Sequence, residues 1–318
     1  MKKTSLAVGI DVGGTNTKYG IVNQQGEILQ QGEVKTTLFP TIESFVDGLY
    51  ERLSPMITEH GKEATIKGIG IGAPNGNHFN GSIEHAPNLK WKGIVPIAKL
   101  MSEKFGIPCV LNNDAKAAAL GELKFGAAKG MKDFIMITLG TGVGSGIIVN
   151  GGLIYGHNGN AGELGHTTIR HNGRLHWSTG LRGTVEAYCS ATGIRLTAIE
   201  MRNRAKKPTL LQQYKDDEIN SKIVFDCAMK GDRVAKRVYE FTGQVLGEAL
   251  ANFTMFSSPE AIVLFGGVTH ACSMLMEPAK KALEKNVLTV YKGQVKLLLS
   301  KLKEADAAIL GASTLVWD

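Results

Sequence analysis

Glycines and hydroxyl-bearing residues gather in one short stretch near the start of the chain, GIDVGGTNTKYGIVN at residues 9–23. Glycine has no Cβ, so backbone N–H groups in such a turn can approach an anion closely. A dinucleotide fingerprint or a P-loop would lead directly into a helix, whereas residues 18–23 have strand character. The stretch therefore predicts a strand, a tight turn and a strand, which fits either an ordinary hairpin or a phosphate-binding turn.

The same order of residues returns in FIMITLGTGVGSGIIVNGG at 134–152. In both copies an apolar strand ends in a polar residue, Asp11 or Thr138, and a Gly/Thr turn leads to a second strand that closes with Ile-Val-Asn. The spacing is too long for a solenoid repeat and instead predicts two related α/β domains. Two facing hairpins would hold a polyphosphate between these domains, so the pair favours anion binding over two ordinary hairpins.

A carboxylate at a predicted strand-to-helix junction, Asp114, fits two roles. Aspartate often caps a helix N-terminus, and phosphoryl transfer to a hydroxyl needs a base that also orients the nucleophile. The roles are compatible, because a helix N-terminus stabilises a carboxylate and predicts that Asp114 is ionised at neutral pH. Glu163 and His166, three residues apart, fit a local turn contact, a metal pair or hydrogen bonds to vicinal sugar hydroxyls.

Helices and strands alternate along the rest of the chain. Periodicity and propensity predict strands at 65–74, 108–112 and 261–267. They predict helices at 41–60 with Pro55 inside, 114–126, 182–205, 218–256 with an interruption near 231–232, 273–285 and 304–317.

The composition is that of an ordinary globular protein. The 318 residues are 43% hydrophobic and 20% charged, and no apolar run approaches the roughly 18 residues that span a membrane. The start has no room for a signal peptide, which predicts a cytoplasmic protein. Four scattered cysteines predict reduced, mostly buried thiols: Cys109, Cys189, Cys227 and Cys272.

The net charge of +7 does not by itself predict a nucleic-acid partner, because the basic residues are spread along the chain. One short cluster is interpreted as a solvated helix end: Arg202, Arg204, Lys206 and Lys207.

Five motifs in order, IDVGGTNTK, NNDAKAAALGE, TLGTGVGSGIIVNG, AGELGH and VLFGGV, resemble the ROK family of sugar kinases and repressors within the actin-like ATPase superfamily. The resemblance implies a two-domain α/β fold, actin-like and related to ribonuclease H, with an interdomain cleft. It also implies ATP and Mg²⁺ as cofactors and a homodimer. With the hairpin repeat, it places one domain at residues 1–115 plus 304–318 and the other at 116–303.

The resemblance also implies roles for individual residues. Asp11 is the carboxylate near magnesium, and Asp114 is the catalytic base. Gly266 and Gly267 pack adenosine against backbone. The phosphate turns are Gly13, Gly14, Thr15 and Asn16, and then Thr138, Gly140, Thr141 and Gly142. The sugar contacts are Asn88, Asn113, Asp114, Glu163, His166 and Glu186.

The chain departs from the family at its zinc motif, C-x-C-G-x-x-G-C followed by an apolar residue and glutamate. Aligned on Glu186, residues 177–184 read WSTGLRGT, with the glycines kept and no cysteine. Hydroxyls are poor zinc ligands, so no structural zinc is expected, although His171 and His176 leave a histidine-rich replacement conceivable. Without zinc, Trp177 is expected to bury apolar area, while local hydrogen bonds come from the hydroxyls of Ser178, Thr179 and Thr184.

The leading function is phosphorylation of glucose to glucose 6-phosphate. N-acetylhexosamine kinases and fructokinases share these motifs, and polyphosphate stays open as a donor. The family's sugar-responsive regulators carry a helix-turn-helix region before the first phosphate strand, for which a strand beginning near Ser5 leaves no room. Actin-like and chaperone ATPases are disfavoured by Asn113, Asp114, Glu163 and His166, since those proteins hold no sugar.

Overall fold

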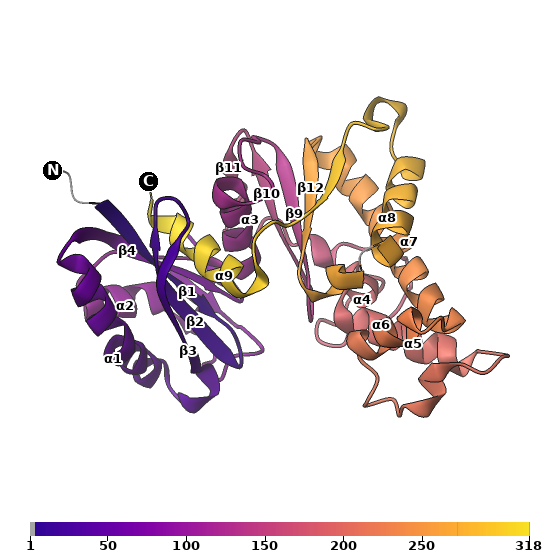
Figure 1. The fold of residues 1–318 in the computed structure, drawn as a ribbon, viewed down its shortest axis with the longest axis horizontal. Coiled ribbons are helices and arrows are strands. Elements are labelled where there is room, and N and C mark those ends of the chain that lie inside the picture. Colours follow the sequence, from indigo (N-terminus) through magenta and orange to yellow (C-terminus); the bar gives the residue numbers. More distant parts are fainter. Residues whose placement is uncertain (1–3, 272, 318) are drawn as a thin grey trace.

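The computed structural model describes residues 4–271 and 273–317, and two five-stranded sheets organise it (Figure 1). The first sheet has the strand order β3 (Ile28–Lys35), β2 (Asn16–Asn23), β1 (Thr4–Val12), β4 (Ala64–Ala73) and β8 (Cys109–Asn113). The second has the order β11 (Gly152–Leu153), β10 (Val143–Val149), β9 (Phe134–Leu139), β12 (Ala261–Phe265) and β13 (Lys296–Leu299). A small sheet contains β5 (Gly76–Asn77), β6 (Ser82–Glu84) and β7 (Ile94–Val95).

The two large sheets share one topology. In the first, β1 pairs antiparallel with β2 and parallel with β4. In the second, β9 pairs antiparallel with β10 and parallel with β12. In the strand register next to the two turns, Asp11 lies opposite Lys18 and Thr138 lies opposite Gly144. The predicted repeat of the strand–turn–strand unit is therefore confirmed.

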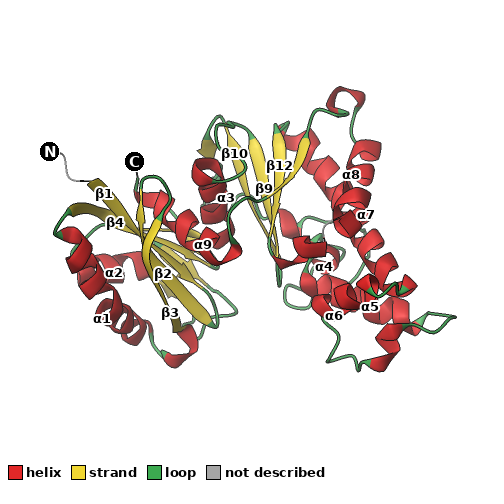
Figure 2. Cartoon of the chain, in the orientation of Figure 1, coloured by secondary structure: helices red, strands yellow, loops and turns green. Residues whose placement is uncertain are grey.

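Helices form layers outside and between the sheets (Figures 1 and 2). The outer layer of the first sheet is α1 (Ile42–Gly61) and α2 (Ile97–Phe105), and α3 (Asp114–Phe125) and α9 (Glu304–Ser313) lie between the sheets. The helices beyond the second sheet are α4 (Glu186–Cys189), α5 (Ala191–Asn203), α6 (Ser221–Met229), α7 (Arg233–Ser257) and α8 (Ser273–Asn286). The α9 backbone lies so close to β4 that a Cβ on Gly70 would be 1.9 Å from the Ala312 oxygen.

Most of the predicted elements are present, but the helix predicted over 182–205 is wrong in two respects. Residues 182–185 are not helical, and Ser190 divides the remainder into α4 and α5. Ser190 is extended, and its hydroxyl accepts a hydrogen bond from Gly193 N at 3.0 Å, which starts a new helix. The predicted interruption near 231–232 is confirmed, since Asp232 caps α7.

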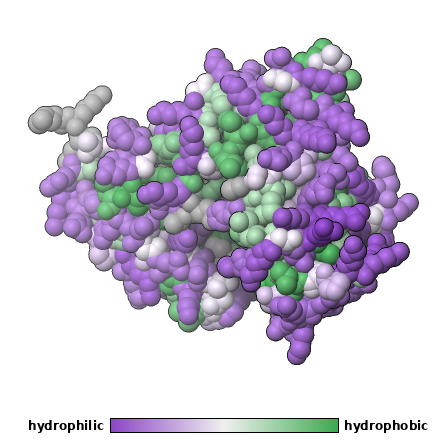
Figure 3. Space-filling view, turned by 45° about the vertical axis from the view of Figure 1, so that its right-hand side comes forward, coloured by the Kyte–Doolittle hydropathy of each residue, from purple (hydrophilic) through white to green (hydrophobic). Residues whose placement is uncertain are grey.

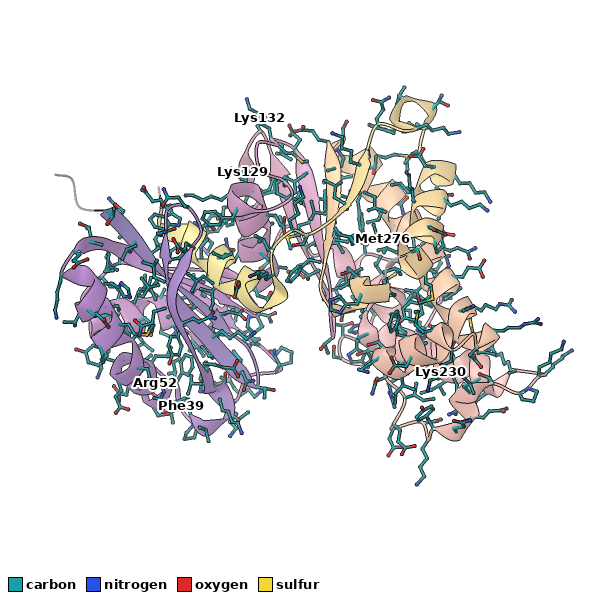
Figure 4. All side chains as sticks on the ribbon, in the orientation of Figure 1. Phe39, Arg52, Lys129, Lys132, Lys230 and Met276 are labelled. Carbon is teal, nitrogen blue, oxygen red and sulfur yellow. The ribbon has the colours of Figure 1, made fainter. Side chains whose placement is uncertain are left out.

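The prediction of a solvated helix end holds for Arg204, Lys206 and Lys207, which are exposed just after α5. It is wrong for Arg202, whose side chain is largely buried, pairs with Asp216 and donates to the Tyr214 oxygen at 2.9 Å. A cavity of about 970 Å³ opens beside this helix end, lined in part by Lys230 (Figure 4). None of the residues predicted to bind ATP or sugar lines this cavity.

Cys189 and Cys227 are buried and Cys109 is half-buried, all as free thiols, while Cys272 lies outside the described residues. The face in Figure 3 is mostly hydrophilic, with separate hydrophobic patches. Within residues 4–271 and 273–317, no helix combines the length and apolar character needed to cross a membrane.

Candidate active site

The first glycine turn connects β1 to β2 and is closed by a hydrogen bond from Gly13 N to the Asn16 oxygen at 3.0 Å. Thr15 and Asn16 are exposed at its tip. Asn88 lies beside the turn, because a Cβ on Gly14 would be 2.6 Å from the Asn88 backbone oxygen. The structure thus brings together the predicted phosphate turn and one predicted sugar contact.

The second turn connects β9 to β10, with Gly140 N donating to the Gly142 oxygen at 3.0 Å. The start of α5 supports it, since Ala191 N donates to the Gly140 oxygen at 2.8 Å. The Thr138 hydroxyl accepts from Gly144 N at 3.1 Å, so this oxygen already has a role inside the hairpin. Thr141 is exposed at the tip.

Gly266 and Gly267, the predicted adenosine contacts, directly follow β12. Gly266 has φ +101°, a backbone conformation that favours glycine. Gly267 lines a cavity of about 400 Å³ together with the rings of Phe225 and Tyr239. Apolar rings beside accessible backbone form a surface that suits a nucleobase.

Asp11 and Asp114 form an acidic pair at the ends of β1 and β8. Asp11 is half-buried, and this burial, together with the charge of Asp114, raises the pKa of Asp11 to about 7, while Lys18 opposes the shift. Two carboxylates that repel one another in this way form a donor set that a divalent cation would relieve. The pair therefore fits Mg²⁺.

Asn113, rather than Asp114, caps α3. Its side-chain oxygen accepts from Ala115 N at 3.0 Å and Lys116 N at 3.3 Å, while Asp114 occupies the first helical position. Asp114 accepts from Ala115 N at 2.7 Å, which favours the charged form. Many protein atoms surround the carboxyl, however, although the residue is exposed at the surface, and the resulting loss of water outweighs this bond and raises the pKa of Asp114. The expected stabilisation of the carboxylate by the helix N-terminus is therefore present but outweighed by burial, and the ionisation of Asp114 at neutral pH stays a prediction.

Asp114 keeps accessible surface, as a group that meets a substrate must. Its charge also raises the pKa of Glu163, although lost hydration is the larger cause and His166 and Lys116 oppose the shift. Glu186 is a further negative neighbour of Glu163. Three of the predicted sugar contacts, Asp114, His166 and Glu186, therefore lie within electrostatic reach of a fourth, Glu163.

Glu186 connects the sugar-binding candidates to the second turn. Its Oε2 accepts from Val143 N at 2.6 Å. Its Oε1 lies 2.6 Å from His176 Nε2. From the sequence, His176 was not predicted to bind or position anything at the sugar site. A signal for such a role was its position directly before Trp177, the first missing cysteine.

Lys116 is a second residue that the sequence reasoning missed. It is buried, and its ammonium donates to the Gly159 oxygen at 2.5 Å. Burial lowers the pKa of Lys116 and the nearby Glu163 carboxylate opposes that shift. Lys116 therefore ties α3 to the Gly159 backbone on the side of the site where Glu163 lies.

The segment that replaces the zinc motif differs from expectation at Trp177, which is 44% exposed and stacks on His176 instead of filling a core. The expected local bonds are present at Thr179, which accepts from Leu181 N at 3.3 Å, and at Thr184, which accepts from Ala187 N at 3.2 Å. His171 is exposed and lies outside the histidine cluster.

A family model described as the ROK family matches residues 7–318. The chain belongs to the ROK family. Among the proteins similar to this ROK chain is a glucokinase of Halalkalibacterium halodurans, 36% identical over 317 residues that cover 97% of this chain and 94% of that protein. A glucokinase of Thermotoga maritima is 32% identical over 323 residues, covering 99% and 98%.

A solved structure of the same family is also similar to this chain. The ROK family glucokinase of Streptomyces griseus, in complex with glucose and AMPPNP, superposes with a TM-score of 0.79 at 30% identity and covers 98% of this chain and 99% of that one. ROK kinase structures have the actin-like ATPase fold, so the predicted fold class is confirmed. This ROK chain is an ATP-dependent sugar kinase.

Proposed function

We propose that the chain transfers the γ-phosphoryl group of ATP to a hydroxyl of glucose, forming glucose 6-phosphate. The observation that carries this proposal is the cluster of Asp114, Glu163, His166 and Glu186, which extends from the acidic pair at the first turn to the second turn. The similarity to proteins named glucokinases supports glucose, rather than an N-acetylhexosamine or fructose, as the proposed substrate.

In this proposal Asp114 orients the sugar hydroxyl and accepts its proton as the phosphoryl group leaves ATP. A raised pKa suits a base, because the carboxylate then binds a proton more strongly than an ordinary aspartate. Glu163, His166 and Glu186 hold the other sugar hydroxyls, assisted by the amide groups of Asn88 and Asn113.

The two turns hold the ATP phosphates through backbone N–H groups, and Gly266 and Gly267 hold the adenosine. Asp11 would hold Mg²⁺, which supplies charge neutralisation at the phosphates when it is bound. Since neither turn brings an arginine, the rest of the charge stabilisation comes from oriented backbone dipoles.

A panel of sugars, assayed with Mg-ATP and with polyphosphate by product formation, tests this assignment. We expect glucose to give the highest kcat/KM and ATP to be the donor. A tenfold preference for an N-acetylhexosamine, for fructose or for polyphosphate would contradict the glucokinase assignment.

Gly140→Ala is expected to weaken ATP binding without unfolding the protein. A Cβ at this position meets no described atom within 4 Å, so the fold has room for it, but that open space is where the phosphates would lie. The KM for ATP should rise about tenfold, as expected for about 1.4 kcal/mol of lost binding, while the KM for glucose stays within about twofold. Steady-state kinetics with each substrate varied in turn measures both values, and an unchanged ATP KM would count against a phosphate turn here.

The proposal includes a cytoplasmic location, a homodimer and no nucleic-acid partner. We also propose two domains, one at residues 1–115 plus 304–318 and the other at residues 116–303. The ends of the first domain, residues 1–3 and 318, lie outside the described part of the chain. Light scattering of the purified protein tests the dimer, with a monomer mass as the contrary result.

A further inference from the structure

The segment at 172–186 is held in place by side chains in this structure. Arg174 donates to the Ala187 oxygen at 2.5 Å and to the Thr197 hydroxyl at 2.9 Å, and its guanidinium lies 4.7 Å from the centre of the Tyr188 ring. Backbone bonds continue the attachment, with His176 N donating to the Leu181 oxygen at 2.8 Å. These contacts cross-link the segment at which the family motif implies a structural zinc.

The donor set fits zinc poorly. His166, His176 and Glu186 place three potential ligand atoms within 4.8 Å of one another, but a structural zinc site needs four good ligands. His176 Nε2 and Glu186 Oε1 are 2.6 Å apart, whereas two ligands of a tetrahedral zinc lie about 3.3–3.6 Å apart, given bonds of roughly 2.0–2.2 Å. The aligned cysteine positions Thr179 and Thr184 offer only hydroxyls.

The hydrogen bonds around His176 assign its tautomer. Nδ1 faces two backbone donors, Ser178 N at 3.4 Å and Thr179 N at 3.3 Å, and the Thr179 hydroxyl at 3.0 Å. Nδ1 is therefore an acceptor, and the proton is on Nε2, directed at Glu186. The side chain of His176 is fully buried and that of Glu186 is 12% exposed, so little water competes with the bond between them.

We propose that His176 takes the place of the family's zinc centre and acts as a positioning residue for Glu186. Its Nε2–H fixes one carboxylate oxygen while Val143 N fixes the other. Glu186 is thereby held in one orientation for the sugar, and the loop of Ser178 and Thr179 is tied to the same point through Nδ1. This inference rests on the proposed sugar-kinase function.

A metal bound by the histidines is the rival explanation, and His166 is the residue that supports it. His166 Nδ1 is buried and has no hydrogen-bond partner among the described residues, and the ring lies edge-on to His176 with centroids 5.6 Å apart. A metal shared by His166, His176 and Glu186 would satisfy that nitrogen, but only if the bond between His176 and Glu186 opened. The experiment must therefore measure metal as well as kinetics.

Metal content is measured on protein purified without a histidine tag, by elemental analysis and by melting before and after a strong chelator, with Mg²⁺ restored for assay. We expect well under one zinc per chain and an unchanged melting temperature. One zinc per chain, lost together with stability on chelation and absent from His176→Gln, would overturn the proposal.

Kinetics tests the positioning role. His176→Ala should raise the sugar KM by about 10–100-fold, as expected when a buried carboxylate loses a donor, with the ATP KM unchanged. His176→Gln, whose amide can still donate to Glu186, should recover most of that loss, and exposed His171→Gln is the matched control. A lower melting temperature with no change in sugar KM would show a merely structural role and overturn the proposal.

Thr179→Val keeps the test decisive if His176→Ala does not fold. It removes the hydroxyl at Nδ1, which also accepts from Leu181 N, from an exposed position. We expect the sugar KM to rise several-fold, and an unchanged value in both Thr179→Val and His176→Gln would overturn the assignment. If the wild type phosphorylates no sugar, the proposed function fails, while the metal and melting measurements still test His176.

Discussion

Replacing Asp114 with asparagine is expected to lower kcat by about three orders of magnitude, in the range for loss of a base that also orients the nucleophile. Asparagine keeps the size of the side chain and an oxygen that can accept from Ala115 N, so α3 should start at the same residue. Asn113 still caps the helix. Single-turnover phosphorylation of glucose, followed by quenched flow, measures the chemical step directly.

The control is Asp47→Asn, which removes a carboxylate that pairs with Lys104 on the exposed surface. It should leave kcat unchanged, because surface ion pairs contribute little and this one lies outside the site. The melting temperature of Asp114→Asn should not fall, since burial disfavours the charge that the substitution removes. A variant that retains more than about a tenth of wild-type kcat would show that Asp114 is not the base.

The fold was predictable because its two sheets begin with the same strand–turn–strand unit, and glycine turns are local features of sequence. The structure of the segment at 182–185 was not predictable, because it depends on partners that are distant in the sequence. Thr184 pairs with Thr168, and Ile169 N and Arg170 N both donate to the Gly183 oxygen, which holds these residues in a non-helical arrangement. Helix propensity carries no information about such partners.

The candidate site was also predictable only in part. Motifs located the carboxylates, but the direction of the Asp114 pKa depends on how much protein surrounds the carboxyl, which only the folded chain determines. The bond between His176 and Glu186 joins residues on either side of the small loop at 177–184. The sequence indicated that zinc ligands were missing there, but not which side chain would occupy the space.

The second large effect is expected at Gly142, which connects the phosphate turn to the sugar-binding cluster. A Cβ at this position would lie 2.5 Å from Glu186 Oε2, closer than real Cβ contacts. Glu186 cannot move aside easily, because Val143 N and His176 hold both of its oxygens. Gly142→Ala should therefore lower kcat/KM for glucose by about 10–100-fold, the effect of roughly 1–3 kcal/mol of overpacking.

A double-mutant cycle identifies the cause of that loss. If the methyl group of Gly142→Ala acts by displacing Glu186, it should cost nothing further in the Glu186→Ala background, because truncation removes the atoms it would meet. Gly152→Ala on β11 is the matched control, since its Cβ would meet the Val149 oxygen at an ordinary 3.7 Å and should leave the kinetics unchanged. Additive losses in the double variant would mean that Gly142 acts on the phosphates alone. A non-additive result would show that the residue shaping the ATP turn also fixes the carboxylate that binds the sugar.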